Sequence, residues 1–356
     1  MFPGYDPLTP RIETIGRIRT VRVPIYPSKS GFTKRLASYF SFVAAASLWG
    51  PKLCTAPDLI FVESPPLFIG YAAKYLARRW HCRFVFNVSD LWPDSAVDLG
   101  IVDANSLAVT LARRLERTLY RDAAGVTGQT DDILATVRER AGTTPTEIIT
   151  NSVDPLRFGP AHADLAAREL LGDEPGPIFI YAGLLGLAQG LDQILDAARA
   201  LPVELPGRFV LVGDGPVREH LVERIEREHI SRVRILPMQP RERIPALLAA
   251  ADIALITLAG NIHGAVPNKI YEAMASSLPI VLVAEGEAAR RVLSADAGIA
   301  VAPKQTAELV AACTSLILDP DRGARLGANG RRAAETIYNR DHVAERLDRF
   351  LRGLLP

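Results

Sequence analysis

The sequence has little cysteine, no excess of either charge and no long apolar run, and each shortage excludes a class of protein. The three cysteines, Cys54, Cys82 and Cys313, are too widely spaced for a zinc motif or a disulfide framework, so we expect reduced thiols in a cytoplasmic protein. The 41 basic and 40 acidic residues leave a net charge of +1, which argues against a nucleic-acid partner. The most apolar stretch, residues 36–50, is shorter than the roughly 20 residues that a transmembrane helix requires.

Most of the chain instead alternates short apolar runs with helical patterns, which is typical of βαβ units and parallel sheets. The runs that predict strands lie at 21–24, 59–63, 84–89, 125–127 and 147–150 in the first half, and at 178–182, 209–212, 233–236, 253–257, 280–283 and 299–301 in the second. A stretch rich in proline and glycine, 155–177, separates the two halves. We therefore predict an N-terminal domain over 1–160 and a C-terminal domain over 161–356.

Two doubly wound α/β domains of similar size also predict where a ligand binds. Ligands of such sheets bind at the carboxyl ends of the parallel strands. Two sets of strand ends that face each other would form a deep cleft, so a cleft between the domains is our first expectation. Two independent domains on a linker are the alternative.

The segment 266–275 (VPNKIYEAMA) combines a helix start with a cation. Pro267 suits the start of a helix and Asn268 can cap it. The first-turn amides and Lys269 would together attract a phosphate, and Glu272, one turn later, could accept hydrogen bonds from a ribose. This set predicts a nucleotide site. The alternative is an ordinary capped helix with a surface lysine.

Two glycine turns follow predicted strands in the second half. Gly183 and Gly186 come directly after the strand at 178–182, and Gly213 ends the next strand. Glycine there lets the backbone approach a phosphate closely. A tight strand-to-helix turn also needs glycine for its own sake, so a purely structural role remains open.

In their order and spacing these motifs resemble the GT-B glycosyltransferases of family 4, the retaining group 1 enzymes. The resemblance is to the bacterial branch that makes colanic acid, O-antigen and other polysaccharides. It rests on PNKIYEAMA (267–275), YAGLLG (181–186) and VGDGP (212–216), together with VPIYP (23–27), SPPL (64–67), SDLWPDS (89–95) and NSVD (151–154). These segments are distributed over nearly the whole chain.

The resemblance implies two Rossmann-like domains that face a cleft, and a last helix that could pack back on the N-terminal domain. It implies transfer of a hexosyl or N-acetylhexosaminyl group, with retention, from a UDP-linked sugar to a glycan or an undecaprenyl-diphosphate-linked acceptor. Neither a metal ion nor a cofactor is implied. The residues it assigns are Asp90 and Lys269 for catalysis, and Gly183, Gly186, Gly213, His263, Gly264, Asn268, Lys269 and Glu272 for the donor.

The chain departs from the family pattern in three places. Where many members have a glutamate eight positions before the one matched by Glu272, this chain has Gly264, so backbone amides or His263 would bind that sugar hydroxyl. Gln189 stands where relatives often carry a cation, which leaves more of the diphosphate charge to Lys269. The family's first strand–glycine turn–helix unit has no counterpart before residue 21. A misplaced start codon, a fragment or an inactive protein would each explain that.

Two other functions remain open. One is a UDP-sugar 2-epimerase, an isomerase that shares the GT-B fold. The other is a truncated, non-catalytic binding partner of a transferase.

A basic and aromatic segment near the N-terminus predicts contact with a membrane surface. Seven lysines and arginines in 1–35 run into the aromatic segment 32–42, which is too short to span a bilayer. We expect peripheral binding to anionic lipid at the inner face of the cytoplasmic membrane. The alternative is that the apolar residues of this helix face the domain core while the charges are solvated.

Overall fold

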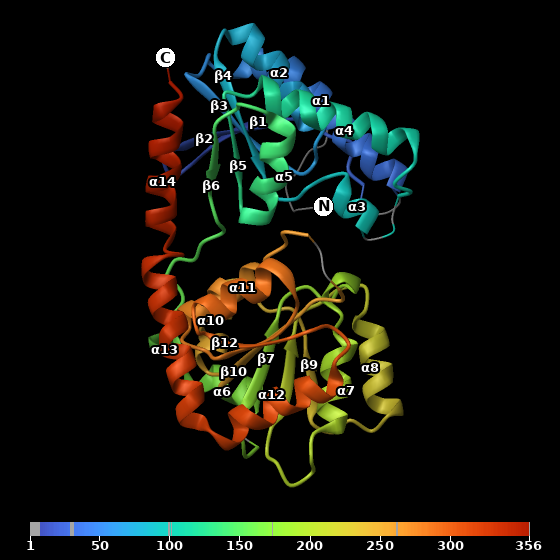
Figure 1. The fold of residues 1–356 in the computed structure, drawn as a ribbon, viewed down its shortest axis with the longest axis vertical. Helices are drawn as coiled ribbons and strands as arrows, with labels where there is room; N and C mark the ends of the chain where they lie inside the picture. Colours follow the sequence, from blue (N-terminus) through green and yellow to red (C-terminus); the bar gives the residue numbers. More distant parts are fainter. Residues whose placement is uncertain are drawn as a thin grey trace. The chain divides into compact units, whose positions relative to one another are not determined.

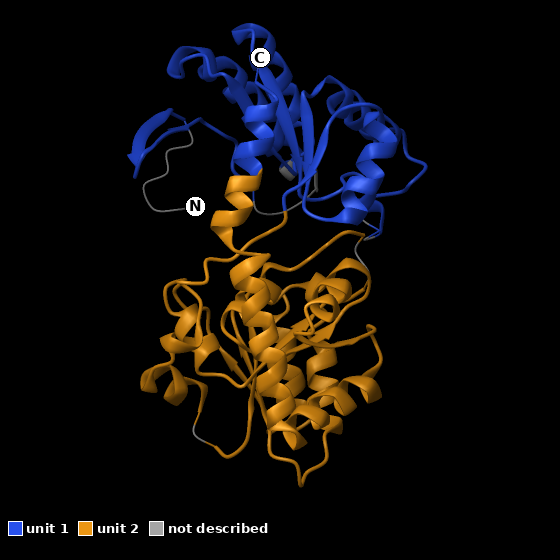
Figure 2. Ribbon diagram, turned by 60° about the vertical axis from the view of Figure 1, so that its left-hand side comes forward, with its two compact units in different colours: residues 1–149, 347–356 blue, residues 150–346 orange. Residues whose placement is uncertain are grey.

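The computed structural model describes residues 8–28, 32–98, 100, 102–172, 174–260 and 263–355 (Figure 1). The chain divides into two compact units, shown in Figure 2. Unit 1 comprises residues 1–149 and 347–356, and unit 2 comprises 150–346. The domain limits predicted above, 1–160 and 161–356, stay a prediction.

Unit 1 contains a parallel sheet with the strand order β3-β4-β5-β6. Helices follow the strands, as the alternating pattern predicts, because parallel neighbours need a crossover connection. The strands are β3 (Leu59–Ser64), β4 (Arg83–Val88), β5 (Gly125–Gly128) and β6 (Thr146–Ile148). The helices are α1 (Phe32–Leu53), α2 (Ile69–Trp80), α3 (Asp94–Asp98), α4 (Leu107–Asp122) and α5 (Asp131–Ala141), with the end of α14 (Arg340–Gly353).

The end of α14 packs on the sheet of unit 1. A side chain at Gly125 of β5 would lie 2.6 Å from Leu354 and 2.8 Å from Phe350. Arg83, at the start of β4, donates a hydrogen bond to the Leu354 carbonyl oxygen at 2.6 Å. Glycine at position 125 therefore lets the C-terminal segment approach the strand directly.

The first predicted strand, 21–24, is not part of this parallel sheet. It overlaps β2 (Ile18–Arg22), which pairs with β1 (Arg11–Ile15) in a separate antiparallel hairpin. The two-residue turn begins at Gly16 with φ +61°, the positive value that tight hairpin turns require. Two hydrogen bonds join the hairpin and the segment after it to α1: Arg19 donates to Leu53, and the Tyr26 amide donates to Ser41.

Unit 2 contains a six-stranded parallel sheet with the order β12-β11-β10-β7-β8-β9. Its strands are β7 (Ile178–Ala182), β8 (Arg208–Val212), β9 (Val233–Leu236), β10 (Ile253–Thr257), β11 (Ile280–Val283) and β12 (Gly298–Val301). Its helices are α6 (Leu165–Leu171), α7 (Asp192–Ala200), α8 (Arg218–Arg227), α9 (Ile244–Ala249), α10 (Asn268–Ala275), α11 (Gly286–Ser294), α12 (Thr306–Leu318) and α13 (Pro320–Thr336). From β7 and β10 the sheet grows outward in both directions, so a topological switch point lies between them.

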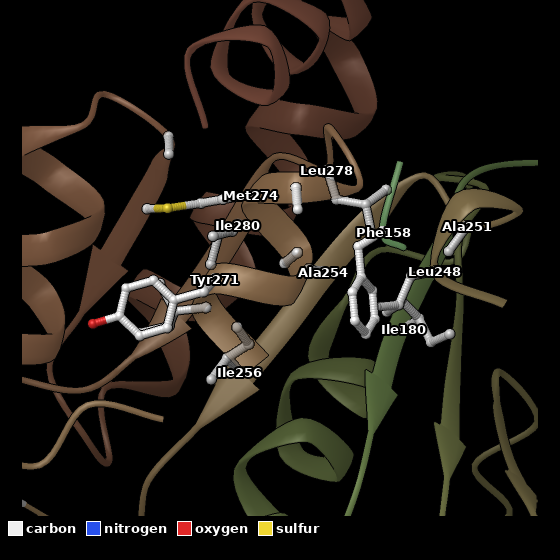
Figure 3. Close-up of a cluster of buried hydrophobic side chains, with 14 of the residues drawn as sticks. Phe158, Ile180, Leu248, Ala251, Ala254, Ile256, Tyr271, Met274, Leu278 and Ile280 are labelled. Atoms are coloured by element: carbon white, nitrogen blue, oxygen red, sulfur yellow. The ribbon is translucent and has the colours of Figure 1, made fainter. Parts of the chain in front are cut away.

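Both faces of this sheet are buried, as expected for parallel strands covered by helices. In β7, Ile178 and Ile180 pack in one apolar cluster, while Phe179 and Tyr181 pack in the cluster on the other face. Figure 3 shows the first cluster, where residues of β7 and β10 meet α10. These two cores fix the ends of the strands from which the candidate site is built.

None of the helices in the described part of the chain combines the length and the apolarity needed to cross a bilayer. All three cysteines are free thiols.

Candidate functional site

The loops after β7 and β10 meet at the carboxyl edge of the unit 2 sheet. Three hydrogen bonds join them: the Ala259 amide donates to Ala188 (2.9 Å), Thr257 Oγ1 donates to Gln189 (2.7 Å) and Gln193 Nε2 donates to Leu258 (3.1 Å). This is the switch point, where open α/β sheets bind their ligands. The glycine turn after β7 and the start of α10 therefore belong to one edge.

The two predicted glycine turns lie against each other and against Lys269. Gly183 has φ +144° and Gly213 has φ +158°, values that favour glycine. A side chain at Gly213 would lie 1.9 Å from the Gly183 carbonyl oxygen, and one at Gly183 would lie 2.3 Å from Lys269 Cε. The structure therefore brings Gly183, Gly213 and Lys269 together, as the sequence predicted for a phosphate site.

Lys269 is held beside this turn by a tyrosine that the sequence analysis did not assign. Its ammonium donates a hydrogen bond to the Tyr181 hydroxyl oxygen at 2.9 Å and lies 4.5 Å from the centre of the ring. The Tyr181 hydroxyl in turn donates to the Leu184 carbonyl oxygen at 2.7 Å. Burial lowers the pKa of Lys269 to about 8, while the Glu272 carboxylate acts in the opposite direction. The result is a partly buried cation at the end of β7.

Asn268 does not cap α10, contrary to the sequence-based expectation. The helix begins at Asn268 itself, Pro267 occupies the capping position, and no side-chain capping bond is made there. Pro267 has φ −63° and ψ 133°, so its backbone is still extended and the helix begins at the next residue, one position earlier than expected. The Asn268 side chain is left exposed at the first turn, where it can still reach a ligand.

Glu272 lies one turn after Lys269 and is half-buried. Burial raises its pKa, whereas the charges of Lys269, Arg241 and Arg157 lower it. Arg157 also donates a hydrogen bond to the Arg241 carbonyl oxygen at 3.3 Å. These two arginines were not predicted, because their sequence neighbourhood contains no motif and only the fold brings them within electrostatic reach of Glu272.

The remaining donor residues of unit 2 lie in nearby loops. Gly186 directly precedes the short 3₁₀ turn Leu187–Gln189 and has φ −119°, so its backbone does not itself require glycine. His263 and Gly264 lie in the loop before α10, His263 exposed and Gly264 buried with φ +71°. Their proposed contacts with the donor stay predictions.

Asp90 belongs to unit 1 and follows β4 at the carboxyl edge of that sheet. Its Oδ2 accepts a hydrogen bond from Ser95 Oγ at 3.0 Å. Burial raises the pKa of Asp90, and the bonds from Ser95 and from the Leu91 amide lower it. The carboxyl group is therefore placed at the edge by the loop and by the first turn of α3.

Other polar side chains share the carboxyl edge of unit 1, and the sequence analysis missed them. Asn87 Nδ2 donates to Glu63 at 2.5 Å, Ser89 Oγ donates to the same carboxylate, and Thr127 Oγ1 donates to Asn87 at 2.6 Å. Glu63, Asn87 and Thr127 come from β3, β4 and β5, and Ser89 directly follows β4. The available signal was a polar residue near the end of each of three apolar strands.

The helix that follows Asp90 is fixed by a partly buried ionic network. Asp94 accepts hydrogen bonds from Arg113 (2.9 and 3.0 Å) and from Arg140 (2.5 Å), and the two arginines lower its pKa against the effect of burial. Arg140 also donates to Glu116 at 2.6 Å, and the Tyr120 hydroxyl donates to Glu116 at 2.8 Å. Glu116 is fully buried. Such a network holds the start of α3, and with it Ser95, in one position.

Two family models match the chain. The one described as "Glycosyl transferases group 1" matches residues 164–333, and the one described as "Glycosyl transferase 4-like domain" matches residues 1–152. The first includes the glycine turns and α10, and the second includes Asp90.

Curated relatives are similar over different shares of their length. The putative colanic acid biosynthesis glycosyl transferase WcaI of Escherichia coli K12 is 25% identical over 346 residues, which cover 93% of this chain and 83% of WcaI. The probable glycosyltransferase WbjE of Pseudomonas aeruginosa is 27% identical over 65% of this chain. The chain spans little more than half of WbjE, 56% of its length.

Solved structures show the same fold. The sucrose-phosphate synthase of Thermosynechococcus elongatus superposes with a TM-score of 0.79 at 21% identity, covering 98% of this chain and 86% of that one. Anabaena HepE, solved in complex with UDP, has a TM-score of 0.71 at 18% identity, covering 91% and 84%. From its family matches and its fold, the chain belongs to the group 1 glycosyl transferases, with the GT-B architecture.

Proposed function

We propose that this chain transfers a sugar from a nucleotide-diphosphate donor to a hydroxyl of a glycan or of a lipid-linked sugar. One observation carries the proposal: the partly buried Lys269 cation lies directly over the Gly183 turn, at the switch point of the unit 2 sheet. A cation beside close-approaching backbone matches the charge and the shape of a diphosphate.

The proposed donor is a UDP-sugar. Solved complexes of HepE with UDP and with UDP-glucose support this choice. Lys269, the Gly183 turn and the first amides of α10 would bind the diphosphate, and Glu272 would accept hydrogen bonds from the ribose. Asn268, Gly186, Gly213, His263 and Gly264 would complete the donor site. The chemistry needs neither a metal ion nor a cofactor if Lys269 and the amides neutralise the leaving group.

The proposed reaction retains the anomeric configuration. The acceptor oxygen forms a bond to the anomeric carbon on the face from which the diphosphate departs. The bond between that carbon and the phosphate oxygen breaks, and its electron pair leaves with the diphosphate. The acceptor proton passes to a departing phosphate oxygen. Lys269 stabilises the charge that develops there, and Asp90 is assigned to the side of donor sugar and acceptor.

The proposed acceptor belongs to cell-surface polysaccharide synthesis. The similarity to WcaI, a putative glycosyl transferase of colanic acid biosynthesis, supports a glycan or an undecaprenyl-diphosphate-linked sugar as the acceptor. The transferred group would be a hexose or an N-acetylhexosamine. A cytoplasmic nucleotide sugar and a lipid-linked acceptor would meet at the inner face of the cytoplasmic membrane, which is the location we propose for the reaction.

A transfer assay tests this proposal. The protein is incubated with UDP-glucose, UDP-N-acetylglucosamine or GDP-mannose and with an undecaprenyl-diphosphate-linked sugar, and products are identified by mass spectrometry and anomeric NMR. We expect one extended lipid-linked product with retained configuration. Conversion of the UDP-sugar into another UDP-sugar in the absence of an acceptor would instead indicate an epimerase. Binding of UDP with no turnover would indicate a non-catalytic binding partner of a transferase.

Peripheral membrane contact is part of the proposal, and exposed residues of unit 1 support it. The tip of the β1–β2 hairpin carries Ile15 and Ile18, 55% and 70% exposed, with Arg17 between them. On α1, Tyr39 and Phe40 are also exposed, although Phe40 packs against Phe68 at 4.7 Å between ring centres. Basic and apolar side chains on one short element suit the headgroup layer. Of the predicted basic residues, Lys29 and the side chain of Arg35 lie outside what the structure describes.

Sedimentation with liposomes tests the membrane contact. We expect binding to vesicles that contain anionic lipid, a decrease as salt rises, and weaker binding of the Ile18→Asp variant. Leu156→Asp is the matched control, because Leu156 is also a largely exposed aliphatic residue, at 86%, but belongs to unit 2. Equal recovery in the supernatant with anionic and neutral vesicles at low salt would contradict the proposal.

A further inference from the structure

The hydroxyl of Tyr181 connects the two parts of the candidate phosphate site. Tyr181 is the fourth residue of β7, and its side chain is 1% exposed. The hydroxyl donates to the Leu184 carbonyl oxygen inside the glycine turn and accepts from Lys269 Nζ of α10. Turn and helix are thus joined through one oxygen atom.

The direction of these hydrogen bonds is fixed by chemistry. A phenol has a single O–H proton, and here Leu184 receives it. The oxygen lone pairs are then left for a donor, and the Lys269 ammonium supplies one at 2.9 Å. A neutral amine in the same place could also donate, but a charged ammonium makes the stronger bond. The arrangement therefore favours the protonated lysine.

The position of Lys269 also depends on the absence of a side chain at Gly183. A side chain at Gly183 would lie 2.8 Å from Nζ, so the ammonium occupies the space that glycine leaves free. The ring of Tyr181 forms the other side, 4.5 Å from Nζ to the ring centre. Glu272, on the same helix, is the carboxylate whose charge acts on this ammonium. The tyrosine is the group that holds the ammonium toward the turn.

We propose that Tyr181 is a positioning residue, whose hydroxyl holds the Lys269 ammonium charged and over the Gly183 turn for a nucleoside diphosphate. The inference rests on the donor site proposed above. It assigns Tyr181 no bond-making step. The hydroxyl keeps the Lys269 side chain in the position that binds the diphosphate. Less conformational entropy of this side chain is then lost when the ligand binds.

Calorimetric titration with UDP, compared for the wild type and Tyr181→Phe at pH 6.5 and 8.5, tests this role. Removing the hydroxyl deletes the hydrogen bond that favours the charged lysine, so we expect the pKa of Lys269 to be lower in the variant than in the wild type. We expect UDP affinity of the wild type to decrease a few-fold between the two pH values. The decrease for Tyr181→Phe should be roughly five- to tenfold larger, since a hydrogen bond to a charged group is worth about one pKa unit or more.

Tyr271→Phe is the matched control. Tyr271 is equally buried, in α10, but its hydroxyl has no hydrogen-bond partner among the described residues. Its loss should leave both the affinity and the pH dependence as in the wild type. Ionisations of UDP itself affect all three proteins alike and cancel in the comparison.

The outcomes separate this inference from the proposal on which it rests. If wild-type protein binds neither UDP, GDP nor ADP, the donor site is wrong. If UDP binds and Tyr181→Phe has the wild-type pH dependence, the positioning role is wrong. A loss of affinity that is equal at both pH values would also contradict it, because general damage to the site does not depend on the protonation of one lysine.

Discussion

The two units are built from the same alternation of strand and helix, yet only one sheet grows in two directions. In unit 2 the order β12-β11-β10-β7-β8-β9 places β7 and β10 side by side, with later strands added on both flanks. The described strands of the unit 1 parallel sheet, β3-β4-β5-β6, follow one another in sequence order. Open α/β sheets bind their ligands at such a switch point. The glycine turns and Lys269 are found at such a point in unit 2.

One charged side chain in each unit shows a second contrast. In unit 1, Glu116 is fully buried but satisfied by Arg140 and Tyr120. In unit 2, Lys269 has a neutral tyrosine as its hydrogen-bond acceptor. A paired charge stabilises a scaffold, whereas a cation without a carboxylate at hydrogen-bond distance remains available for an anion. The comparison therefore predicts opposite results when the two charges are removed.

The largest expected effect is on the stability of unit 1. Arg140→Met leaves the buried Glu116 without its cation, which should lower the free energy of unfolding by about 3–5 kcal/mol. The three tryptophans, Trp49, Trp80 and Trp92, all lie in unit 1, so their fluorescence during urea unfolding reports on this unit. The double variant Glu116→Gln/Arg140→Met should recover much of the loss. A single variant as stable as the wild type would show that the network does not support the unit.

The next effect is on activity through unit 2. Lys269→Ala should lower kcat/KM by about 10- to 150-fold, because a hydrogen bond to a charged group contributes roughly 1.5–3 kcal/mol. Its unfolding curve followed by circular dichroism, which reports on the helices of both units, should stay close to that of the wild type. Arg227→Ala, at an exposed cation of α8 in the same unit, is the control for a general loss of charge. Unaltered kinetics in Lys269→Ala would remove the lysine from the site.

A smaller effect is expected on UDP affinity when Glu272, the residue assigned to the ribose, is changed. Glu272→Gln keeps one acceptor oxygen, so UDP affinity measured by calorimetry should fall by only about two- to tenfold. The wild type should bind 2′-deoxy-UDP less tightly than UDP, and the variant should discriminate less. Equal preference for UDP over 2′-deoxy-UDP in both proteins would contradict the assignment of Glu272.

The smallest effect is a dependence of unit 2 stability on pH. The pKa of Lys269 is about 8 in the folded chain against an ordinary value of 10.5. Between these values the unfolded chain binds the proton and the folded chain does not, so this residue makes stability rise with pH. Compared with Lys269→Met in scanning calorimetry, the wild type should gain about 1 kcal/mol or less from pH 7 to 9. If the difference in stability between the wild type and Lys269→Met is the same at all pH values, the pKa of Lys269 is not shifted in the folded chain.

The sequence predicts those features of the fold and of the candidate site whose signal lies within a few consecutive residues. Each parallel strand from 59 onward was predicted, and the signal is plainest in β8, β10 and β11, which are buried throughout and mostly apolar. The proximity of Gly183 and Lys269 followed from motif order and is confirmed. The hairpin was missed because 11–20 is mostly polar or charged and lacks the apolar run of a buried strand. Arg157 and Arg241 were missed because long-range packing brings them to Glu272.

The interlocked glycines have a consequence for redesigning this protein. Because the Gly183 carbonyl oxygen fills the space of any side chain at 213, and Lys269 fills that at 183, neither position can be exchanged alone. The two turns that contain Gly183 and Gly213 are therefore fixed, whereas the exposed residues around them can vary. Under the donor site proposed above, selection for a new donor would act on the residues around the turns: on Leu184, which is 59% exposed, and on the exposed Asn268 and His263. A combinatorial library that keeps Gly183, Gly213 and Lys269 and varies these three positions would contain no variants with disrupted glycine turns.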